Sequence, residues 1–264
     1  MVDPLTSLLL PDVAIPSDPA DLPALLPRLL ERFSLIPYEN LTKVLSVHEK
    51  QSRIVKHSPE DVVLGFLSHG TGGTCFPLTA TLVRLVRSLG LEAHPILADR
   101  RYGSDTHCAV IVKLTPTEWS LIDPGYLIHQ PVQLPTTGSH FVETPFNHLE
   151  LRVTSSPDRI ELLTLNETSS RSRLTYKITP VDEAHFQRAW DASFSWEMMT
   201  YPIVSGVRGS EQIYLQKSAL LRRSSTGSER QEMDTARLAC EISQRLGIDL
   251  SLVQRALTLL SRTS

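Results

Sequence analysis

The sequence predicts an α+β protein in which helices come first, short strands follow and mixed structure ends the chain. Apolar residues recur at three- and four-residue spacing up to Gly90, and afterwards short β-rich runs alternate with turn residues. Closely spaced strands with little helix between them are typical of an antiparallel sheet or an open barrel. The 264 residues are enough to bury a large core without disulfides or metals.

Three helical segments are expected before Gly90. Residues 17–34 open with cap-like residues and place leucines on one face, and two internal prolines divide the segment into two pieces. Residues 58–67 start with Ser-Pro-Glu-Asp, which combines an N-cap, a first-turn proline and acidic side chains. The third segment places the apolar residues of 78–89 on a buried stripe.

Strands dominate the middle of the chain, and the last third is mixed. The predicted strands are residues 93–98, 108–114, 119–122, 149–153, 159–165 and 172–178. The last third has helical patterns at 182–192, 229–246 and from 249 or 251 to 260, a strand-like run at 212–217 and a Ser/Arg-rich stretch, 222–228, that is typical of an exposed loop. No internal repeat is visible.

Composition narrows the function classes. Apolar residues make up 41% and charged residues 21%, and 26 basic and 29 acidic residues are well mixed, with a net charge of −3. This balance predicts neither a nucleic-acid footprint nor an anionic-membrane footprint, and it does not specify an oligomeric state.

Three widely spaced cysteines argue against a disulfide framework and against a paired Cys-x-x-Cys zinc site, so no metal is expected. The first ten residues lack the basic region of a signal peptide, and no run approaches the roughly 18 apolar residues of a membrane span. These features predict a cytoplasmic protein in a reducing compartment.

The most informative stretch is the glycine-rich loop His-Gly-Thr-Gly-Gly-Thr-Cys-Phe-Pro, residues 69–77. Its glycines permit close backbone approach, and Pro77 suits the first turn of a helix. Cys75 is therefore expected at a helix N-terminus, where the helix dipole favours a thiolate and makes the sulfur nucleophilic. The alternative is that Cys75 is an ordinary buried, inert cysteine.

A cysteine nucleophile needs a base and a group that orients the base. His107 opens the strand 108–114, and Asp123 ends the strand 119–122. If these strands are adjacent and antiparallel, His107 and Asp123 lie side by side and complete a triad with Cys75. The alternatives are that His107 is a hydrogen-bonded core histidine and that Asp123 closes a turn on its own backbone.

Taken in order, several short motifs resemble those of the arylamine N-acetyltransferase family. They cover residues 17–135 best, with a weaker similarity at residues 199–202. The matching pieces are Ile36-Pro37-Tyr38-Glu39-Asn40-Leu41, Gly72-Gly73-Thr74-Cys75-Phe76, Leu89-Gly90-Leu91, Thr106-His107 and Leu121-Ile122-Asp123-Pro124-Gly125-Tyr126.

The resemblance implies a cysteine-protease-like core in three subdomains. Residues 1–90 would form a helical subdomain with the nucleophile loop, residues 91–181 a β-barrel subdomain with the histidine and aspartate, and residues 182–264 an α/β lid. It also implies the triad Cys75, His107 and Asp123.

The implied reaction is an acyl transfer of the kind used in xenobiotic metabolism. The acetyl group of acetyl-CoA would pass to the cysteine as a thioester intermediate and then to an arylamine, hydrazine or related small-molecule amine. By the same resemblance Phe76 and Tyr126 would line the acceptor pocket, although Phe76 also suits plain helix packing. Gly103 and Ser104 would lie where the coenzyme enters.

The chain also departs from the family pattern. Thr71 stands where an arginine that pairs with the residue matching Glu39 is usual, Pro77 replaces a glutamate and Leu127 replaces a glycine. Thr74 replaces the usual aromatic residue before the cysteine. Glu39 must therefore find another partner or face water. These departures keep two alternatives open: an amide synthase that takes its acyl chain from a carrier protein, and a catalytically idle relative that acts as a binding protein.

Overall fold

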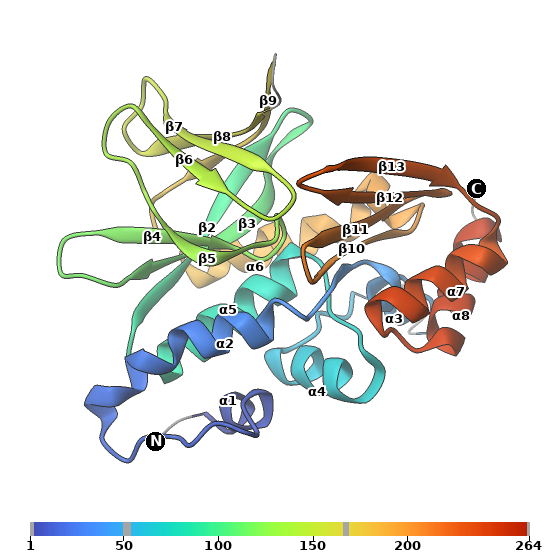
Figure 1. Cartoon of the computed structure of the whole chain (residues 1–264), viewed down its shortest axis with the longest axis horizontal. Coiled ribbons are helices and arrows are strands. Elements are labelled where there is room, and N and C mark those ends of the chain that lie inside the picture. The colour runs from blue at the N-terminus through green and yellow to red at the C-terminus, as the bar shows by residue number, and fades with distance from the viewer. Residues whose placement is uncertain (1–2, 50–53, 166–168, 263–264) are drawn as a thin grey trace.

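The computed structural model describes residues 3–49, 54–165 and 169–262. Helices occupy both ends of the chain, and two antiparallel sheets lie between and beside them (Figure 1). The α-helices are α1 Pro4–Leu9, α2 Leu26–Phe33, α3 Leu41–Glu49, α4 Pro59–His69, α5 Cys75–Ser88, α6 Glu183–Ala192, α7 Thr235–Leu246 and α8 Leu250–Arg262, and the 3₁₀ helices are η1 Pro19–Leu25, η2 Ser193–Ser195 and η3 Glu197–Met199.

The larger sheet has eight antiparallel strands in the order β5-β4-β3-β2-β9-β8-β7-β6 and curls into a nearly closed barrel (Figure 1). Its two edge strands, β5 and β6, lie close to each other: the Gln130 side chain of β5 donates a hydrogen bond to the Glu143 carbonyl of β6 at 3.4 Å. The strands of this sheet are β2 Glu92–Arg100, β3 Gly103–Lys113, β4 Trp119–Asp123, β5 Ile128–Gln133, β6 Ser139–Glu143, β7 His148–Val153, β8 Arg159–Leu165 and β9 Ser170–Lys177.

The smaller sheet joins the two ends of the chain. Its order is β1-β10-β11-β12-β13, so β1, from the N-terminal third, pairs with a strand that follows it by more than half the chain. One face packs on α3, α7 and α8 through a separate apolar cluster. The strands are β1 Tyr38–Glu39, β10 Ile203–Arg208, β11 Glu211–Gln216, β12 Ala219–Ser224 and β13 Gly227–Glu232.

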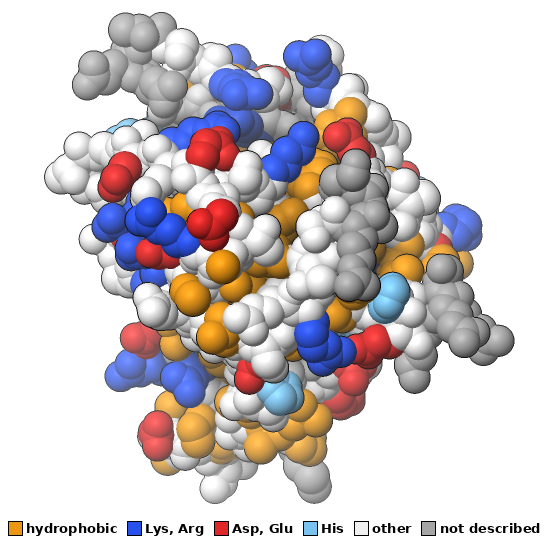
Figure 2. All heavy atoms as spheres, turned by 90° about the vertical axis from the view of Figure 1, so that its right-hand side faces the viewer, with side chains coloured by type: hydrophobic (Ala, Val, Ile, Leu, Met, Phe, Trp, Pro, Cys, Tyr) orange, Lys and Arg blue, Asp and Glu red, His pale blue; other side chains and the backbone are white. Residues whose placement is uncertain are grey.

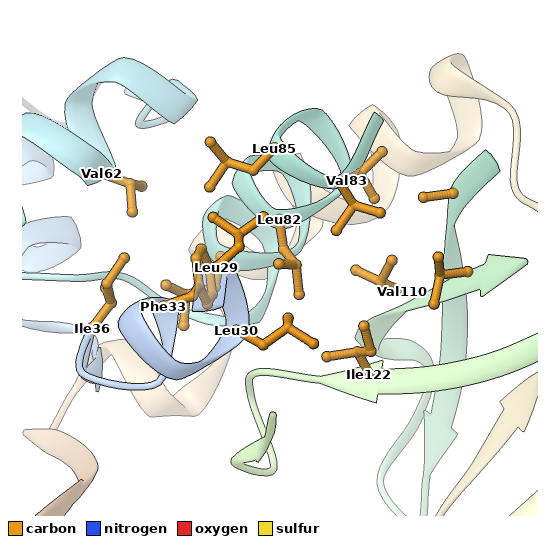
Figure 3. Close-up of a cluster of buried hydrophobic side chains, with 14 of the residues drawn as sticks. Leu29, Leu30, Phe33, Ile36, Val62, Leu82, Val83, Leu85, Val110 and Ile122 are labelled. Atoms are coloured by element: carbon orange, nitrogen blue, oxygen red, sulfur yellow. The ribbon is translucent and has the colours of Figure 1, made fainter. Parts of the chain in front are cut away.

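Helix α5 is the centre of the N-terminal core. Leu82 and Leu85 are fully buried against α2 and α4, while Val83 faces β3 and β4 of the barrel (Figure 3). Burying a leucine side chain stabilises the fold by about 1.5–3 kcal/mol relative to leaving it in water, so this helix is rigidly held. The N-terminus of α5 is thereby fixed beside the barrel.

Most of the predicted helices and strands are confirmed. The segment 17–34 is divided at its prolines into η1 and α2, and α4 begins with a capping box in which Ser58 and Asp61 each cap the other's backbone. Helix α5 ends before Gly90, which adopts a φ of 77°. These outcomes follow from local signals that tertiary contacts reinforce.

Two predictions in the last third are wrong. Residues 222–228 are not a long loop: they form the end of β12, a two-residue turn and the start of β13. The helix expected over 229–246 begins only at Thr235. Arg222 pairs with Glu229 in the register of these two strands and also bonds to Glu211. Cross-strand ion pairs therefore hold a polar hairpin that has no apolar alternation to reveal it.

The charge distribution agrees with the mixed sequence. On the face shown in Figure 2, acidic and basic side chains are interspersed with apolar ones. Among the helices of the described residues, none is long and apolar enough to cross a membrane.

Candidate active site

Cys75 is the first residue of α5, where the sequence places it, and its side chain is 2% exposed. The preceding glycines are pressed against the chain that leads into β1. A Cβ on Gly72 would lie 1.9 Å from the Pro37 carbonyl oxygen, and the Gly73 carbonyl accepts a hydrogen bond from the Glu39 N–H at 2.9 Å. Only glycine permits this approach at position 72, so the loop holds the thiol in one place.

The surroundings of Cys75 favour its thiolate. The thiol of Cys108 hydrogen bonds to it, and this contact, together with His107 and the nearby Arg100 charge, outweighs burial and places the pKa of Cys75 well below its ordinary value. Burial and the same contact raise the pKa of Cys108, whose sulfur lies 3.4 Å from the Thr79 hydroxyl oxygen. Cys75 therefore ionises more readily than Cys108.

His107 lies near the start of β3, and Asp123 is the last residue of β4, the strand that pairs with β3. Nε2 of His107 lies 2.7 Å from Oδ2 of Asp123, and both side chains are 0% exposed. Burial alone would favour neutral forms, but the mutual contact lowers the pKa of Asp123 and raises that of His107. The expected juxtaposition of histidine and aspartate is present.

Asp123 has two further donors. The Tyr176 hydroxyl, from β9, donates to Oδ2 at 2.5 Å, and the Tyr126 N–H donates to Oδ1 at 2.9 Å. The carboxylate therefore closes a turn on its own backbone and also holds the histidine, so the two interpretations of Asp123 are compatible. Tyr176 has no sequence signal, because it is brought in from 53 residues away.

One position shows how closely the three predicted triad residues converge. A Cβ on Gly125 would lie 2.6 Å from Cε1 of His107, 3.3 Å from Oδ1 of Asp123 and 3.3 Å from Cβ of Cys75. All three residues thus have an atom within 3.3 Å of one point next to Gly125. This geometry permits a cysteine nucleophile, a histidine base and a carboxylate that orients the base.

The two candidate acceptor-pocket residues have different ring neighbours. The Tyr126 ring is perpendicular to the His107 ring, with centroids 5.3 Å apart, and is partly exposed. Phe76 is fully buried in an aromatic cluster with Phe186 and Trp190 of α6, at 5.4 and 6.1 Å. Helix packing therefore accounts for the contacts of Phe76.

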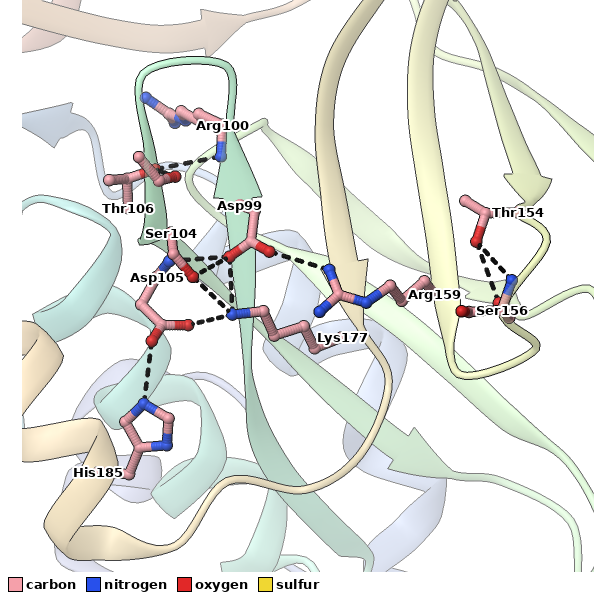
Figure 4. A network of polar contacts seen from close by, with 11 residues as sticks. Asp99, Arg100, Ser104, Asp105, Thr106, Thr154, Ser156, Arg159, Lys177 and His185 are labelled. Atoms are coloured by element: carbon pink, nitrogen blue, oxygen red, sulfur yellow. Dashed lines mark hydrogen bonds and ion pairs between the residues drawn. The ribbon is translucent and has the colours of Figure 1, made fainter.

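Gly103 and Ser104 lie on the hairpin between β2 and β3, next to a network of charged groups (Figure 4). The Ser104 hydroxyl donates to Asp99 at 2.8 Å and accepts from Lys177 at 3.0 Å. Asp105, with a positive φ of 57°, also bonds to Lys177. The hydroxyl of Ser104 is thus engaged in holding this hairpin to β9.

The carboxylate of Glu39 has hydrogen-bond donors within the fold. Its carboxylate is fully buried and accepts hydrogen bonds from the N–H and the hydroxyl of Thr42, at 2.9 and 2.6 Å, and from the Gly72 N–H at 3.2 Å. These neutral donors replace an arginine. Glu39 therefore still ties the start of α3 to the nucleophile loop.

Sequence analysis missed Arg100, the last residue of β2. Its Nη2 atom lies 3.0 Å from Nδ1 of His107. Cys108 and Tyr176 were missed as well. Within the described ranges, no group of three or more His, Cys, Asp or Glu side chains could hold a metal ion.

Comparison with known proteins places this geometry in a family. The chain belongs to the arylamine N-acetyltransferase family: the family model described as N-acetyltransferase matches residues 21–255. No curated protein matches significantly by sequence.

Solved structures of arylamine N-acetyltransferases share the fold. The enzyme from Mycobacterium abscessus is 21% identical, with a TM-score of 0.78 over 96% of this chain and 94% of that one. The Mycobacterium marinum enzyme is 16% identical, with a TM-score of 0.80 over 98% and 99%. The same enzyme in complex with CoA is 16% identical, with a TM-score of 0.76 over 89% and 91%.

Proposed function

We propose that this protein transfers an acyl group from acetyl-CoA to an arylamine, a hydrazine or a related amine by way of an acyl-Cys75 intermediate. The observation that carries the proposal is the convergence of Cys75, His107 and Asp123 around Gly125. Family membership supports acetyl transfer, and the CoA complex of the Mycobacterium marinum relative supports the coenzyme as donor.

The chemistry of the first half-reaction suits this site. The Cys75 thiolate attacks the thioester carbonyl, the bond from carbon to the coenzyme sulfur breaks, and the acyl group remains activated as a thioester on the protein. Negative charge develops on the carbonyl oxygen during attack. Because Thr74 gives α5 no side-chain cap, the Cys75 N–H and a neighbouring loop amide are suited to receive that charge.

The second half-reaction needs a base. His107, oriented by Asp123, would accept the proton of the incoming amine while the nitrogen attacks the acyl carbon and Cys75 leaves as a thiolate. Tyr126 stands beside the His107 ring and would border the acceptor. Gly103 and Ser104 would contact the coenzyme from the hairpin, most simply through the backbone, since the Ser104 hydroxyl is already bonded.

The depressed pKa of Cys75 favours an active enzyme over an idle relative, because an inert buried thiol would have a raised pKa. Incubation with acetyl-CoA followed by intact-mass measurement tests the proposal. A single acetyl adduct is expected on the wild type and on Cys240→Ala, which changes an exposed cysteine, and none on Cys75→Ala. Failure to form an adduct with any acyl thioester would refute acyl transfer.

A further inference from the structure

Arg100 reaches the catalytic centre from the end of β2. Its Nη2 atom lies 3.0 Å from Nδ1 of His107, and its Nη1 atom donates to the Tyr102 hydroxyl at 2.8 Å. The guanidinium carbon lies 5.6 Å from the centroid of the Tyr126 ring. The cation is therefore held between the proposed base and the proposed acceptor pocket.

In the described part of the chain this cation has no carboxylate partner, and the anion that it stabilises is the Cys75 thiolate. Among the described residues, no carboxylate lies within 4.0 Å of the Arg100 guanidinium, whereas Lys177, on the same hairpin network, pairs with both Asp99 and Asp105. The Nε atom of Arg100 is buried and has no hydrogen-bond partner in the described part of the chain. A buried N–H without an acceptor is costly, and a guanidinium with such a free donor is a ready site for an anion.

The contact with His107 also has a chemical consequence. A guanidinium is always protonated and can only donate, so Nδ1 must accept and the histidine proton must be on Nε2, facing Asp123. In this arrangement Arg100 occupies the nitrogen through which His107 would take a proton. An anion that binds the guanidinium and draws it away would leave Nδ1 free.

We infer that Arg100 forms a carboxylate-binding subsite beside Cys75 and selects substrates that carry a carboxylate close to the reacting atom. The planar fork of an arginine matches the two oxygens of a carboxylate. The carboxylate has two possible sources: the acyl chain of the donor, or the acceptor amine. Either would supply a carboxylate partner for Arg100, which the described residues do not provide.

Alkylation of Cys75 tests the subsite without requiring acyl transfer. In both iodoacetate and iodoacetamide the sulfur forms a bond to carbon and iodide leaves, but only iodoacetate carries a carboxylate. The ratio of the two rates at Cys75, measured by peptide mass mapping, is compared with the ratio for glutathione. Because charge-assisted hydrogen bonds are strong, we expect the ratio of the iodoacetate rate to the iodoacetamide rate to be about 10- to 100-fold higher for Cys75 than for glutathione.

Three variants locate the effect. Arg100→Gln should bring the ratio down to that of glutathione, and Arg100→Lys should give an intermediate value because it keeps the charge without the fork. Arg101→Gln, which removes an exposed arginine from the same hairpin, should keep the wild-type ratio. A wild-type ratio equal to that of glutathione, or an unchanged ratio in Arg100→Gln, would overturn the inference.

Steady-state assays then distinguish the two sources, and they rest on the proposed function. One arm compares succinyl-CoA with acetyl-CoA at a fixed neutral arylamine, and the other compares 4-aminobenzoate with its methyl ester at fixed acetyl-CoA. If the carboxylate belongs to the acyl chain, kcat/KM should be higher with succinyl-CoA than with acetyl-CoA. If it belongs to the amine, kcat/KM should be higher with 4-aminobenzoate than with its methyl ester. Arg100→Gln should abolish the preference in either case. An equal loss of kcat/KM in Arg100→Gln on charged and neutral substrates would overturn the subsite. Absence of all acyl transfer would refute the proposed function, and the alkylation ratio would then test the role of Arg100 by itself.

Discussion

Asp123 and His107 form a fully buried pair in which Oδ2 of the carboxylate lies 2.7 Å from Nε2 of the imidazole. A buried carboxylate in contact with one ring nitrogen fixes the tautomer and the orientation of the ring. The pair is held by adjacent antiparallel strands, so its geometry does not depend on a mobile loop.

Replacing the carboxylate should disable the base. Asp123→Asn keeps the shape but presents an amide to Nε2, which allows the wrong tautomer. By analogy with other triads, kcat should fall by about 10³- to 10⁴-fold. Acetylation of a model arylamine measures the effect, with the exposed Asp158→Asn as the matched control. Near-normal turnover in Asp123→Asn would exclude a catalytic role for this carboxylate.

The Tyr176 hydroxyl should matter for stability against acid. Burial opposes ionisation of Asp123, but His107 and Tyr176 hold its pKa below the ordinary value, so its contribution to stability is present above a pH of about 4 and is lost as the pH falls through the folded-state pKa. Tyr176→Phe removes one donor and raises that pKa, so the loss should begin at higher pH.

Because a hydrogen bond to a charged group contributes about 1.5–3 kcal/mol, Tyr176→Phe should lower the free energy of unfolding at neutral pH by a similar amount. Urea unfolding at a series of pH values measures both effects. Tyr201→Phe, whose ring is stacked under Lys217, is the control. Parallel stability curves for wild type and Tyr176→Phe would contradict the proposed support of Asp123.

Gly125 should not tolerate any side chain. The added Cβ in Gly125→Ala would lie 2.6 Å from Cε1 of His107, so the ring or the turn must shift. Displacement of a catalytic group by about 1 Å costs about 10²-fold in rate, and we expect kcat to fall by that order. Initial rates at saturating substrate, together with a thermal melt, separate lost activity from lost folding. Full activity in a folded Gly125→Ala would mean that the three side chains are not held at the distances seen.

Leu127 combines strain with burial. It has a positive φ of 59°, although its side chain is only 5% exposed. A left-handed conformation costs a non-glycine residue about 1–2 kcal/mol, whereas burying the leucine gains about 1.5–3 kcal/mol. Both Leu127→Ala and Leu127→Gly should therefore lose stability by removing the buried side chain.

Glycine alone relieves the strain at position 127. Leu127→Gly should consequently be more stable than Leu127→Ala by about 1 kcal/mol, the reverse of the usual order of these two residues. Chemical denaturation of the two variants gives the difference directly. If alanine is the more stable, the backbone at this position is not held in the left-handed region.

Local patterns predicted much of this architecture. Helices α4 and α5 follow from caps and apolar periodicity, and the predicted barrel strands follow from short β-rich runs between turn residues. Asp123 ends β4, and the sequence predicted that His107 opens the neighbouring strand, which made their meeting foreseeable once the strands were assumed adjacent. Strand β3 in fact begins earlier, at Gly103. Cys75 was marked by its glycines and the helix that follows.

The residues and strands without a sequence signal are placed by strand pairing. Tyr176 approaches Asp123 because β9 pairs with β2 at Ala98, which is itself paired with His107. Arg100 reaches His107 across the hairpin of β2 and β3. Strand β13 is polar along its whole length and is recognisable only from its register with β12. Sequence patterns describe neighbours along the chain and do not show which strands pair in the fold.

The proposed reaction requires that Cys75 carries the acyl group to the acceptor. To test it, the protein is incubated with acetyl-CoA, freed of the coenzyme by rapid gel filtration and then mixed with an arylamine. We expect the acetyl adduct to disappear from Cys75 and an equal amount of the acetylated amine to form. An adduct that persists, or one that is lost to water without any acetylated amine, would contradict it.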